Sequence, residues 1–333
     1  MIRFSRRLLL AGLGLTAAGL AVPAPLAAEE AKLPVVATFS ILGDFVERVG
    51  GDRVAVKTLV GPNGDAHVYE PTPADAKALS AAKVVFVNGI GFEGWMARLA
   101  KASGTRAPIV TTTTGLTPRE LADDDHDEAP AKGAEKGHDH DHAKKAKAKG
   151  HEGHDHGGLD PHAWQSVANV KTYVANIRDG LIAADPAGKE AYTANATAYL
   201  AELEALEAEV KTKIAAVPAE RRRVITGHDA FGYFAAAYGI EFLAPQGIST
   251  ESEVTAKAVA KLIRQIKAEK ITAVFVENMT DRRLIDRVAK ETGVTPGGEL
   301  FADALSPKGG PAPTYVDMVR HNVTLLTRAM AGS

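Results

Sequence analysis

Three histidines stand singly in this 333-residue sequence, each where a predicted strand or loop leads into a helix. His67 lies in GPNGDAHVYEPTPAD, His162 in LDPHAW and His228 in ITGHDAF. Imidazole is the commonest protein ligand for zinc, and a closed tetrahedral site needs a fourth donor. Asp303, in ELFADALSP, follows a strand-like run and is the candidate for that position. Each residue alone is equally a capping or turn residue, and spacing along the chain does not show that the four meet in space.

Seven further histidines lie in one biased segment, 123–158, which contains almost no aliphatic or aromatic side chains beyond alanine. Such a segment buries too little apolar area to offset its ordering entropy, so we predict a mobile loop. Its imidazoles would provide several weak zinc sites without fixed geometry. These histidines are His126, His138, His140, His142, His151, His154 and His156. The eleventh histidine, His321, lies in the apolar terminal helix predicted over 314–330, where we expect a surface or capping role.

The first 28 residues predict a secretory signal peptide. Arg3, Arg6 and Arg7 precede an apolar run of about 15 residues and a small-residue segment. That run is shorter than the roughly 20 residues of a membrane span, and the arginine pair is compatible with either the general or the twin-arginine export route. The sequence contains no cysteine, so we expect no disulfide, no thiolate ligand and no lipid attached after signal cleavage. The prediction is a soluble periplasmic protein that is not a lipoprotein.

The charge balance argues against a nucleic-acid partner. Removing residues 1–28 takes away three arginines and no acid, which leaves 36 basic against 41 acidic residues. A nucleic-acid-binding protein is usually basic over its binding surface.

Strand-like and helix-like segments alternate along both parts of the chain, which predicts an α/β fold with parallel sheets flanked by helices. The segment beginning at Lys83, KVVFVNGIGFEGWMARLAKASG, aligns without a gap with TAVFVENMTDRRLIDRVAKETG from Thr272, with seven identities in 22 positions. Two similar lobes are therefore expected. The predicted strands are 33–39, 54–60, 83–88, 108–111, 223–226 and 272–277, and the clearest helices are 41–49, 74–82, 255–269 and 282–292.

One long helix is predicted between the lobes. The segment 189–217 is rich in Ala, Leu, Glu and Lys and contains no glycine or proline, with Pro186 shortly before it and Pro218 directly after it. A helix of roughly 30 residues is about 45 Å long, and no turn residue favours a helical hairpin instead. The expected domains are a signal peptide at 1–28, an N-terminal lobe at 29–186, the linking helix at 187–217 and a C-terminal lobe at 218–333.

The segments GPNGDAHVYEPTPAD, LDPHAW, TGHDAFGYF, VFVEN and LFADALS resemble, in the same order, the metal-specific solute-binding proteins of ABC transporters that take up zinc or manganese. The resemblance covers essentially the whole mature chain, including the long helix and the His-rich insertion. It implies two α/β lobes, a rigid linking helix and one metal in the cleft between the lobes. Its ligands fall on His67 and His162 of the first lobe and on His228 and Asp303 of the second.

The resemblance also indicates which metal is bound. Manganese members usually carry glutamate at the third ligand position, so His228 favours zinc, and a nitrogen-rich ligand set independently favours the same metal. The predicted function is periplasmic capture of Zn2+ and its delivery to a membrane permease driven by a cytoplasmic ATPase. We expect a monomer, with a periplasmic zinc chaperone as a further candidate partner.

Three alternatives stay open at this point: a manganese-binding member of the same family, a zinc buffer or metallochaperone that works through the His-rich loop, and a zinc hydrolase. A hydrolase needs an open coordination position and a general base. The sequence has no HExxH, no GxSxG and no Gly-rich phosphate loop, so we expect no enzyme.

Carboxylates near the four ligands should orient the histidine rings. Sequence position offers four candidates without choosing among them, whereas three aromatic residues beside the ligand loops are expected to pack as walls. The carboxylates are Asp65, Asp160, Asp229 and Glu277, and the aromatic residues are Tyr69, Trp164 and Phe231.

Overall fold

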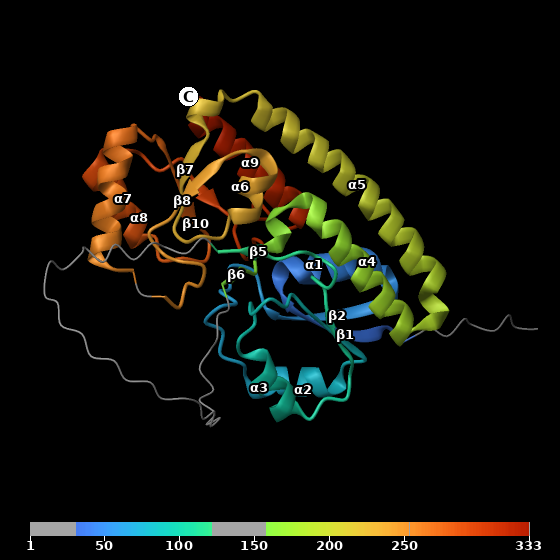
Figure 1. Cartoon of the computed structure of the whole chain (residues 1–333). Coiled ribbons are helices and arrows are strands. Elements are labelled where there is room, and N and C mark those ends of the chain that lie inside the picture. The colour runs from blue at the N-terminus through green and yellow to red at the C-terminus, as the bar shows by residue number, and fades with distance from the viewer. Residues whose placement is uncertain (1–30, 122–157, 253, 333) are drawn as a thin grey trace, which may run out of the picture. The chain divides into compact units, whose positions relative to one another are not determined.

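The N-terminal part of the chain builds a four-stranded parallel sheet in the order β2-β1-β3-β4. We describe it from a computed structural model of residues 31–121, 158–252 and 254–332. Strand β1 is almost fully buried, as its apolar sequence predicts. Figure 1 shows α1 and α4 on one face of the sheet and α2 and α3 on the other. The bounds are β1 (Leu33–Phe39), β2 (Val54–Val60), β3 (Val84–Val87), β4 (Ile109–Thr111), α1 (Ser40–Gly50), α2 (Pro73–Ala81), α3 (Met96–Ser103) and α4 (Val167–Ala184).

The C-terminal part repeats the plan with a smaller parallel sheet, ordered β8-β7-β9, and a separate parallel pair, β10-β11. The four helices of this part are α6 to α9. The bounds are β7 (Arg223–Ile225), β8 (Glu241–Leu243), β9 (Ala273–Val274), β10 (Val276–Glu277), β11 (Glu299–Leu300), α6 (Gly232–Tyr238), α7 (Ala256–Glu269), α8 (Arg283–Thr292) and α9 (Tyr315–Ala331).

The single strand predicted over 272–277 is divided, and this corrects the sequence-based expectation. The backbone N–H of Phe275 donates to the carbonyl of Ile225 in β7, whereas that of Val276 donates to the carbonyl of Gly298, next to β11. The chain therefore changes partners in the middle of the apolar run. An apolar run indicates a buried strand but does not indicate which neighbour the strand pairs with.

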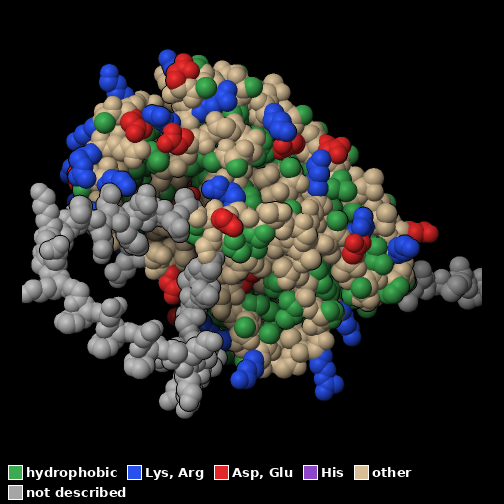
Figure 2. Space-filling view, in the orientation of Figure 1, with side chains coloured by type: hydrophobic (Ala, Val, Ile, Leu, Met, Phe, Trp, Pro, Cys, Tyr) green, Lys and Arg blue, Asp and Glu red, His purple; other side chains and the backbone are tan. Residues whose placement is uncertain are grey.

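The predicted long helix is present as α5 (Lys189–Ala215), of 27 residues and roughly 40 Å. Side chains at spacings of three and four residues form its buried face, which packs on α1 and α4 and on α6 and α9. Figure 2 shows basic and acidic side chains interspersed along the outer side of this helix. The buried residues are Tyr192, Ala196, Tyr199, Leu203, Leu206, Val210 and Ile214. We call the described residues before α5 the N-terminal half and those after it the C-terminal half.

One continuous hydrophobic core joins the two halves. It runs from β1 and α1 through α4 and α5 to α6 and α9, and a smaller cluster lies under α7 and α8. The α/β class predicted from the sequence is confirmed, and α5 with its neighbours gives the halves a packed connection.

Two short strands, β5 (Arg119–Glu120) and β6 (Leu159–Asp160), pair in antiparallel fashion on either side of the histidine-rich segment. Residues 122–157, with all seven histidines of that segment, lie outside the described residues, as does the predicted signal peptide at 1–28. Among the helices that the structure describes, none combines the length and the apolar character needed to cross a membrane.

Candidate metal centre

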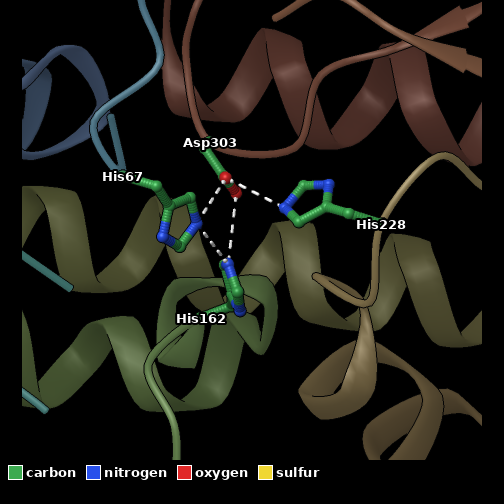
Figure 3. Close-up of side chains that lie close together, drawn as sticks. All are labelled: His67, His162, His228 and Asp303. Carbon is green, nitrogen blue, oxygen red and sulfur yellow. Dashed lines mark hydrogen bonds and ion pairs between the residues drawn. The ribbon is translucent and has the colours of Figure 1, made fainter. Parts of the chain in front are cut away.

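The side chains of His67, His162, His228 and Asp303 converge on one point (Figure 3). One candidate ligand atom from each residue lies within 4.8 Å of all the others. His67 Nε2 is 3.3 Å from His162 Nε2 and 3.2 Å from Asp303 Oδ2, and His228 Nε2 is 3.1 Å from Asp303 Oδ2. His162 Nε2 is 3.7 Å from Asp303 Oδ1. Residues up to 236 positions apart in the sequence therefore form one cluster.

These separations suit a divalent metal. Bonds of about 2.0–2.1 Å to nitrogen and oxygen in a tetrahedron place the ligand atoms about 3.3 Å from one another. The four contacts given above, of 3.1 to 3.7 Å, bracket that value, and all the ligand atoms lie within 4.8 Å of one another. His162, His228 and Asp303 are fully buried, so the ligands are shielded from bulk water.

His67 follows β2 in a loop that two contacts hold in place. Its backbone N–H donates to Oδ1 of Asp65 over 2.9 Å. The indole N–H of Trp95 donates to the carbonyl of Ala66 over 2.8 Å. The ring of His67 also lies edge-on to Phe92, with the centroids 4.8 Å apart. These contacts fix the ring of His67 and the backbone directly before it.

His162 follows β6 and is oriented by Asp160. Oδ1 of Asp160 lies 3.0 Å from the backbone nitrogen of His162 and 2.9 Å from its Nδ1. Nδ1 is thereby occupied, and Nε2 faces the centre (Figure 3). A carboxylate behind a ligating histidine is a common arrangement because it fixes the ring and its tautomer.

His228 follows β7 and has the same kind of support from Glu277 at the end of β10. Oε1 of Glu277 accepts the backbone N–H groups of Gly227, at 2.6 Å, and of His228, at 3.0 Å. Its Oε2 is hydrogen-bonded to His228 Nδ1. Glu277 is therefore fully engaged in holding one ligand.

Asp303 lies just beyond β11, and residues next to His162 position its backbone. Trp164 Nε1 and Gln165 Nε2 both donate to the carbonyl of Ala302, over 3.0 and 2.7 Å. Oδ1 of Asp303 is buried and has no hydrogen-bond partner among the described residues. A buried carboxylate oxygen without a donor is well placed to bind a cation.

The charges of the cluster depend on one another. Burial by itself would lower the pKa of His228, but Glu277 and Asp303 outweigh it and raise that pKa well above its usual range. Burial would raise the pKa of Asp303, but His228 and His162 hold it well below its usual range. Burial lowers the pKa of His67. The centre thus favours a neutral imidazole at His67 and an ionised carboxylate at Asp303, which are the forms that bind metals.

The structure brings together all four ligand residues chosen from the sequence. Of the four carboxylates proposed to support them, three contact a ligand residue and one does not. Asp160 and Glu277 contact ligand rings, and Asp65 contacts the backbone of His67. The side chain of Asp229 is exposed, and its backbone N–H donates to the carbonyl of Gly247. His321 Nε2 lies 2.9 Å from the carbonyl of Glu299, away from the cluster.

Two supporting residues were not predicted from the sequence, and the role of Trp164 was predicted only in part. Gln165 and Trp95 hold the backbone beside Asp303 and His67. Trp164 is buried, as expected for wall packing, but it also donates to Ala302. Gln165 lies three residues after His162, which is a weak signal, and no sequence feature connects Trp95 with the loop of His67.

Comparison with known proteins shows which chains resemble this one. The family described as the periplasmic component A of the zinc-uptake complex matches residues 35–329. The manganese-binding lipoprotein MntA of Halalkalibacterium halodurans is 34% identical over 87% of this chain and 86% of that protein. The iron transporter substrate-binding lipoprotein MtsA of Streptococcus pyogenes serotype M1 is 33% identical over 91% of each chain. The structure of the periplasmic zinc-binding protein TroA from Treponema pallidum matches 90% of this chain and all of that one, with a TM-score of 0.77 and 29% identity.

The comparison contradicts one prediction, that the protein is a freely soluble periplasmic protein and not a lipoprotein. MntA and MtsA are both named lipoproteins, and they align with this chain over most of its length. The prediction rested on the absence of cysteine alone. Relatives with the same fold are named lipoproteins. The absence of cysteine therefore does not by itself exclude a membrane-attached form of this protein.

Proposed function

Since the chain belongs to the family of periplasmic metal-binding proteins that serve ABC transporters, we propose that its cargo is Zn2+, held by His67, His162, His228 and Asp303. Members of this family are substrate-binding proteins and not enzymes, and they work with a membrane permease and an ATPase. The bound ion would pass from the cluster to the permease when the protein docks. Transport requires only binding and release, and no bond in a substrate is broken.

The convergence of three imidazole nitrogens and one carboxylate within 4.8 Å of one another carries the choice of zinc. Zinc favours four ligands with nitrogen prominent among them, whereas manganese prefers more oxygen donors and higher coordination. Asp303 would complete the set and leave no open position for an activated water. This closed arrangement also agrees with a binding role.

Manganese is the second candidate, and a specific observation favours it. MntA is named for manganese, and it is as similar to this chain as relatives named for other metals. Oδ1 of Asp303 has no hydrogen bond to any residue that the structure describes, so both carboxylate oxygens are available to one ion. Two-oxygen binding by Asp303 would raise the coordination number in the direction that manganese prefers.

The further sequence-based predictions belong to the same proposal. The histidine-rich segment, 123–158, would collect zinc weakly for the main site, and a periplasmic zinc chaperone is a possible donor. The protein would act as a monomer, with lobes at 29–186 and 218–333 on either side of the linking helix and a signal peptide at 1–28. Deleting residues 123–157 should remove weak zinc sites and leave one tight site.

Competition titration tests the proposed cargo. Zinc and manganese affinities are measured against a chromophoric chelator for the wild type, for His67→Ala, His228→Ala and Asp303→Ala, and for His321→Ala as the matched control. We expect tighter binding of zinc than of manganese, a large loss in the first three variants and none in His321→Ala. Tighter binding of manganese than of zinc would identify manganese as the cargo in place of zinc. Unchanged tight binding in a combined His67→Ala, His228→Ala variant would refute the site.

A further inference from the structure

Asp160 and Glu277 support their histidines in parallel ways, one in each half. Each carboxylate binds the backbone N–H and the Nδ1 atom of the same ligand residue. In both cases the other ring nitrogen, Nε2, faces the centre (Figure 3). The first ligand, His67, has no such carboxylate on its ring among the described residues. The site therefore has two rings whose orientation depends on a carboxylate behind them.

The two carboxylates differ in what holds them. Both oxygens of Glu277 accept hydrogen bonds from the loop that carries His228. Oδ2 of Asp160, in contrast, is buried and has no hydrogen-bond partner in the described part of the chain. Nε of Arg119 lies 3.6 Å from this oxygen and is also buried, without a hydrogen bond to any described residue. Opposite charges face each other just beyond hydrogen-bonding distance.

The C-terminal half closes around this pair through the first turn of α6. A Cβ atom on Gly232 would lie 2.6 Å from Oδ2 of Asp160 and 2.9 Å from Nε of Arg119, so no side chain fits there. The neighbouring Tyr233 accepts the backbone N–H of Arg119 over 2.8 Å and donates to the carbonyl of Asp160 over 3.0 Å. Helix α6 is thus held against β5 and β6, directly behind the second ligand.

We infer that Arg119 is a positioning residue for His162 that acts through Asp160, and that the approach of α6 at Gly232 sets the contact between them. This inference rests on the proposed metal site. The guanidinium is a cation that faces the free oxygen of Asp160, and the carboxylate of Asp229 also lies within electrostatic reach of both groups. The guanidinium opposes rotation of the Asp160 carboxylate away from Nδ1 of His162. Because Arg119 and Asp160 come from one half and Gly232 from the other, the orientation of one ligand depends on packing between the halves.

A double-mutant cycle separates this role from a general effect on folding. Zinc affinity is measured for the wild type, Arg119→Gln, Asp160→Asn and the double variant. Loss of a group that orients a metal ligand typically costs 10- to 100-fold in affinity. We expect that range for Asp160→Asn and up to about tenfold for Arg119→Gln. If Arg119 acts through Asp160, the double variant binds no more weakly than Asp160→Asn.

Matched variants complete the experiment. Arg119→Lys keeps the charge and should recover part of the lost affinity, whereas Arg98→Gln, at an exposed position on α3, should behave as wild type. Gly232→Ala should weaken zinc binding and alter the visible absorption of the Co2+-loaded protein, which reports ligand geometry. Gly94→Ala is its control, because a Cβ there meets no atom within 4 Å.

Two results would overturn the inference: Arg119→Gln with the affinity of wild type, or an equal loss from Arg119→Gln whether or not Asp160 is present. If Gly232→Ala does not fold, Tyr233→Phe takes its place, because loss of the hydroxyl weakens the same contact. The same loss of zinc affinity and change in Co2+ absorption are then expected. The variant His162→Ala distinguishes a failure of the proposed metal site from a failure of the proposed role of Arg119. Unchanged affinity in that variant refutes the metal site itself, whereas a large loss there beside an unaffected Arg119→Gln refutes only the role of Arg119.

Discussion

Thr250 donates a hydrogen bond from its hydroxyl to Oδ2 of Asp65 over 2.7 Å, and the other oxygen of the same carboxylate accepts the backbone N–H of His67. Thr250 lies in the C-terminal half, and Asp65 lies in the loop that carries the first ligand. Nearby, Asn278 Nδ2 donates to Oδ1 of Asn63 over 2.9 Å. The loop of His67 is therefore held by the half of the molecule that supplies two of the other three ligands, His228 and Asp303.

Replacing Thr250 with valine should speed the release of metal. The change removes one hydrogen bond to a carboxylate and keeps the shape of the side chain, so we expect a loss of about 1 kcal/mol, or about fivefold in affinity. The measurement is the dissociation rate of zinc in the presence of excess chelator. Thr324→Val is the control, since its hydroxyl bonds only to the carbonyl of Arg320 on the surface of α9. Equal rates in the two variants would contradict a role for the Thr250 contact.

Replacing Glu277 with glutamine should weaken zinc binding by about 10- to 100-fold. The amide oxygen can still accept the backbone N–H groups of Gly227 and His228, so the loop keeps its shape. The negative charge behind Nδ1 is lost, and with it part of the electron-donating strength of the His228 ring. Affinity is measured by chelator competition, and thermal unfolding in chelator checks that the fold is retained. Glu291→Gln, on the surface of α8, is the comparison, and a similar affinity in both variants would refute the prediction.

The elements and the ligands were predictable because both leave local signals. Buried strands such as 33–39 are apolar runs, and the ligands sit in short loops directly after such runs. His67 and His228 follow strands of parallel sheets, whose carboxyl ends are where such folds place binding residues, whereas His162 follows the antiparallel pair β5-β6. The point at which the strand predicted over 272–277 changes partner, at Phe275, left no such signal.

The supports of the ligands were predictable only in part. Asp65 and Asp160, each two residues before its histidine, were among the candidates and contact that histidine. The other supports are contacts between segments far apart in the chain. Asp229 is the immediate neighbour of His228, yet the carboxylate that binds the ring is Glu277, 49 positions away. Gln165 and Ala302 are 137 positions apart. Proximity in sequence favours the wrong carboxylate here because Asp229 makes no contact with the His228 ring in the described residues, and only the fold determines which distant group fills the space behind the ring.

Replacing His228 with glutamate should shift the preference of the site from zinc toward manganese. The substitution exchanges a nitrogen donor for an oxygen donor, which suits the harder ion. We expect the ratio of zinc to manganese affinity to fall by about tenfold or more. His228→Gln provides a neutral oxygen and serves as the control for loss of the imidazole alone. An unchanged ratio in the glutamate variant would show that the third ligand does not set the preference.

Asp44 should make stability depend on pH through a contact that joins α1 to α9. Its Oδ2 accepts the backbone N–H of Tyr315 over 2.9 Å. Burial raises the pKa of Asp44 to about 6, with Glu47 and Asp317 adding to the rise and the Tyr315 N–H and Arg48 opposing it. Because the folded-state pKa lies above the unfolded value of 3.8, the stabilising contribution is complete below about pH 4 and is lost as the pH rises through 6.

Asp44→Asn keeps the acceptor for Tyr315 and removes the charge. We expect the variant to be more stable than wild type at pH 8, by about 3 kcal/mol, and the difference to vanish near pH 4. Denaturant unfolding in chelator at several pH values measures this, and the ligand histidines titrate alike in both proteins, so their contribution cancels. Asp52→Asn, at an exposed position, should show no such pH-dependent difference. A gain in Asp44→Asn that is the same at pH 4 and pH 8 would mean that the charge of Asp44 is not its cause.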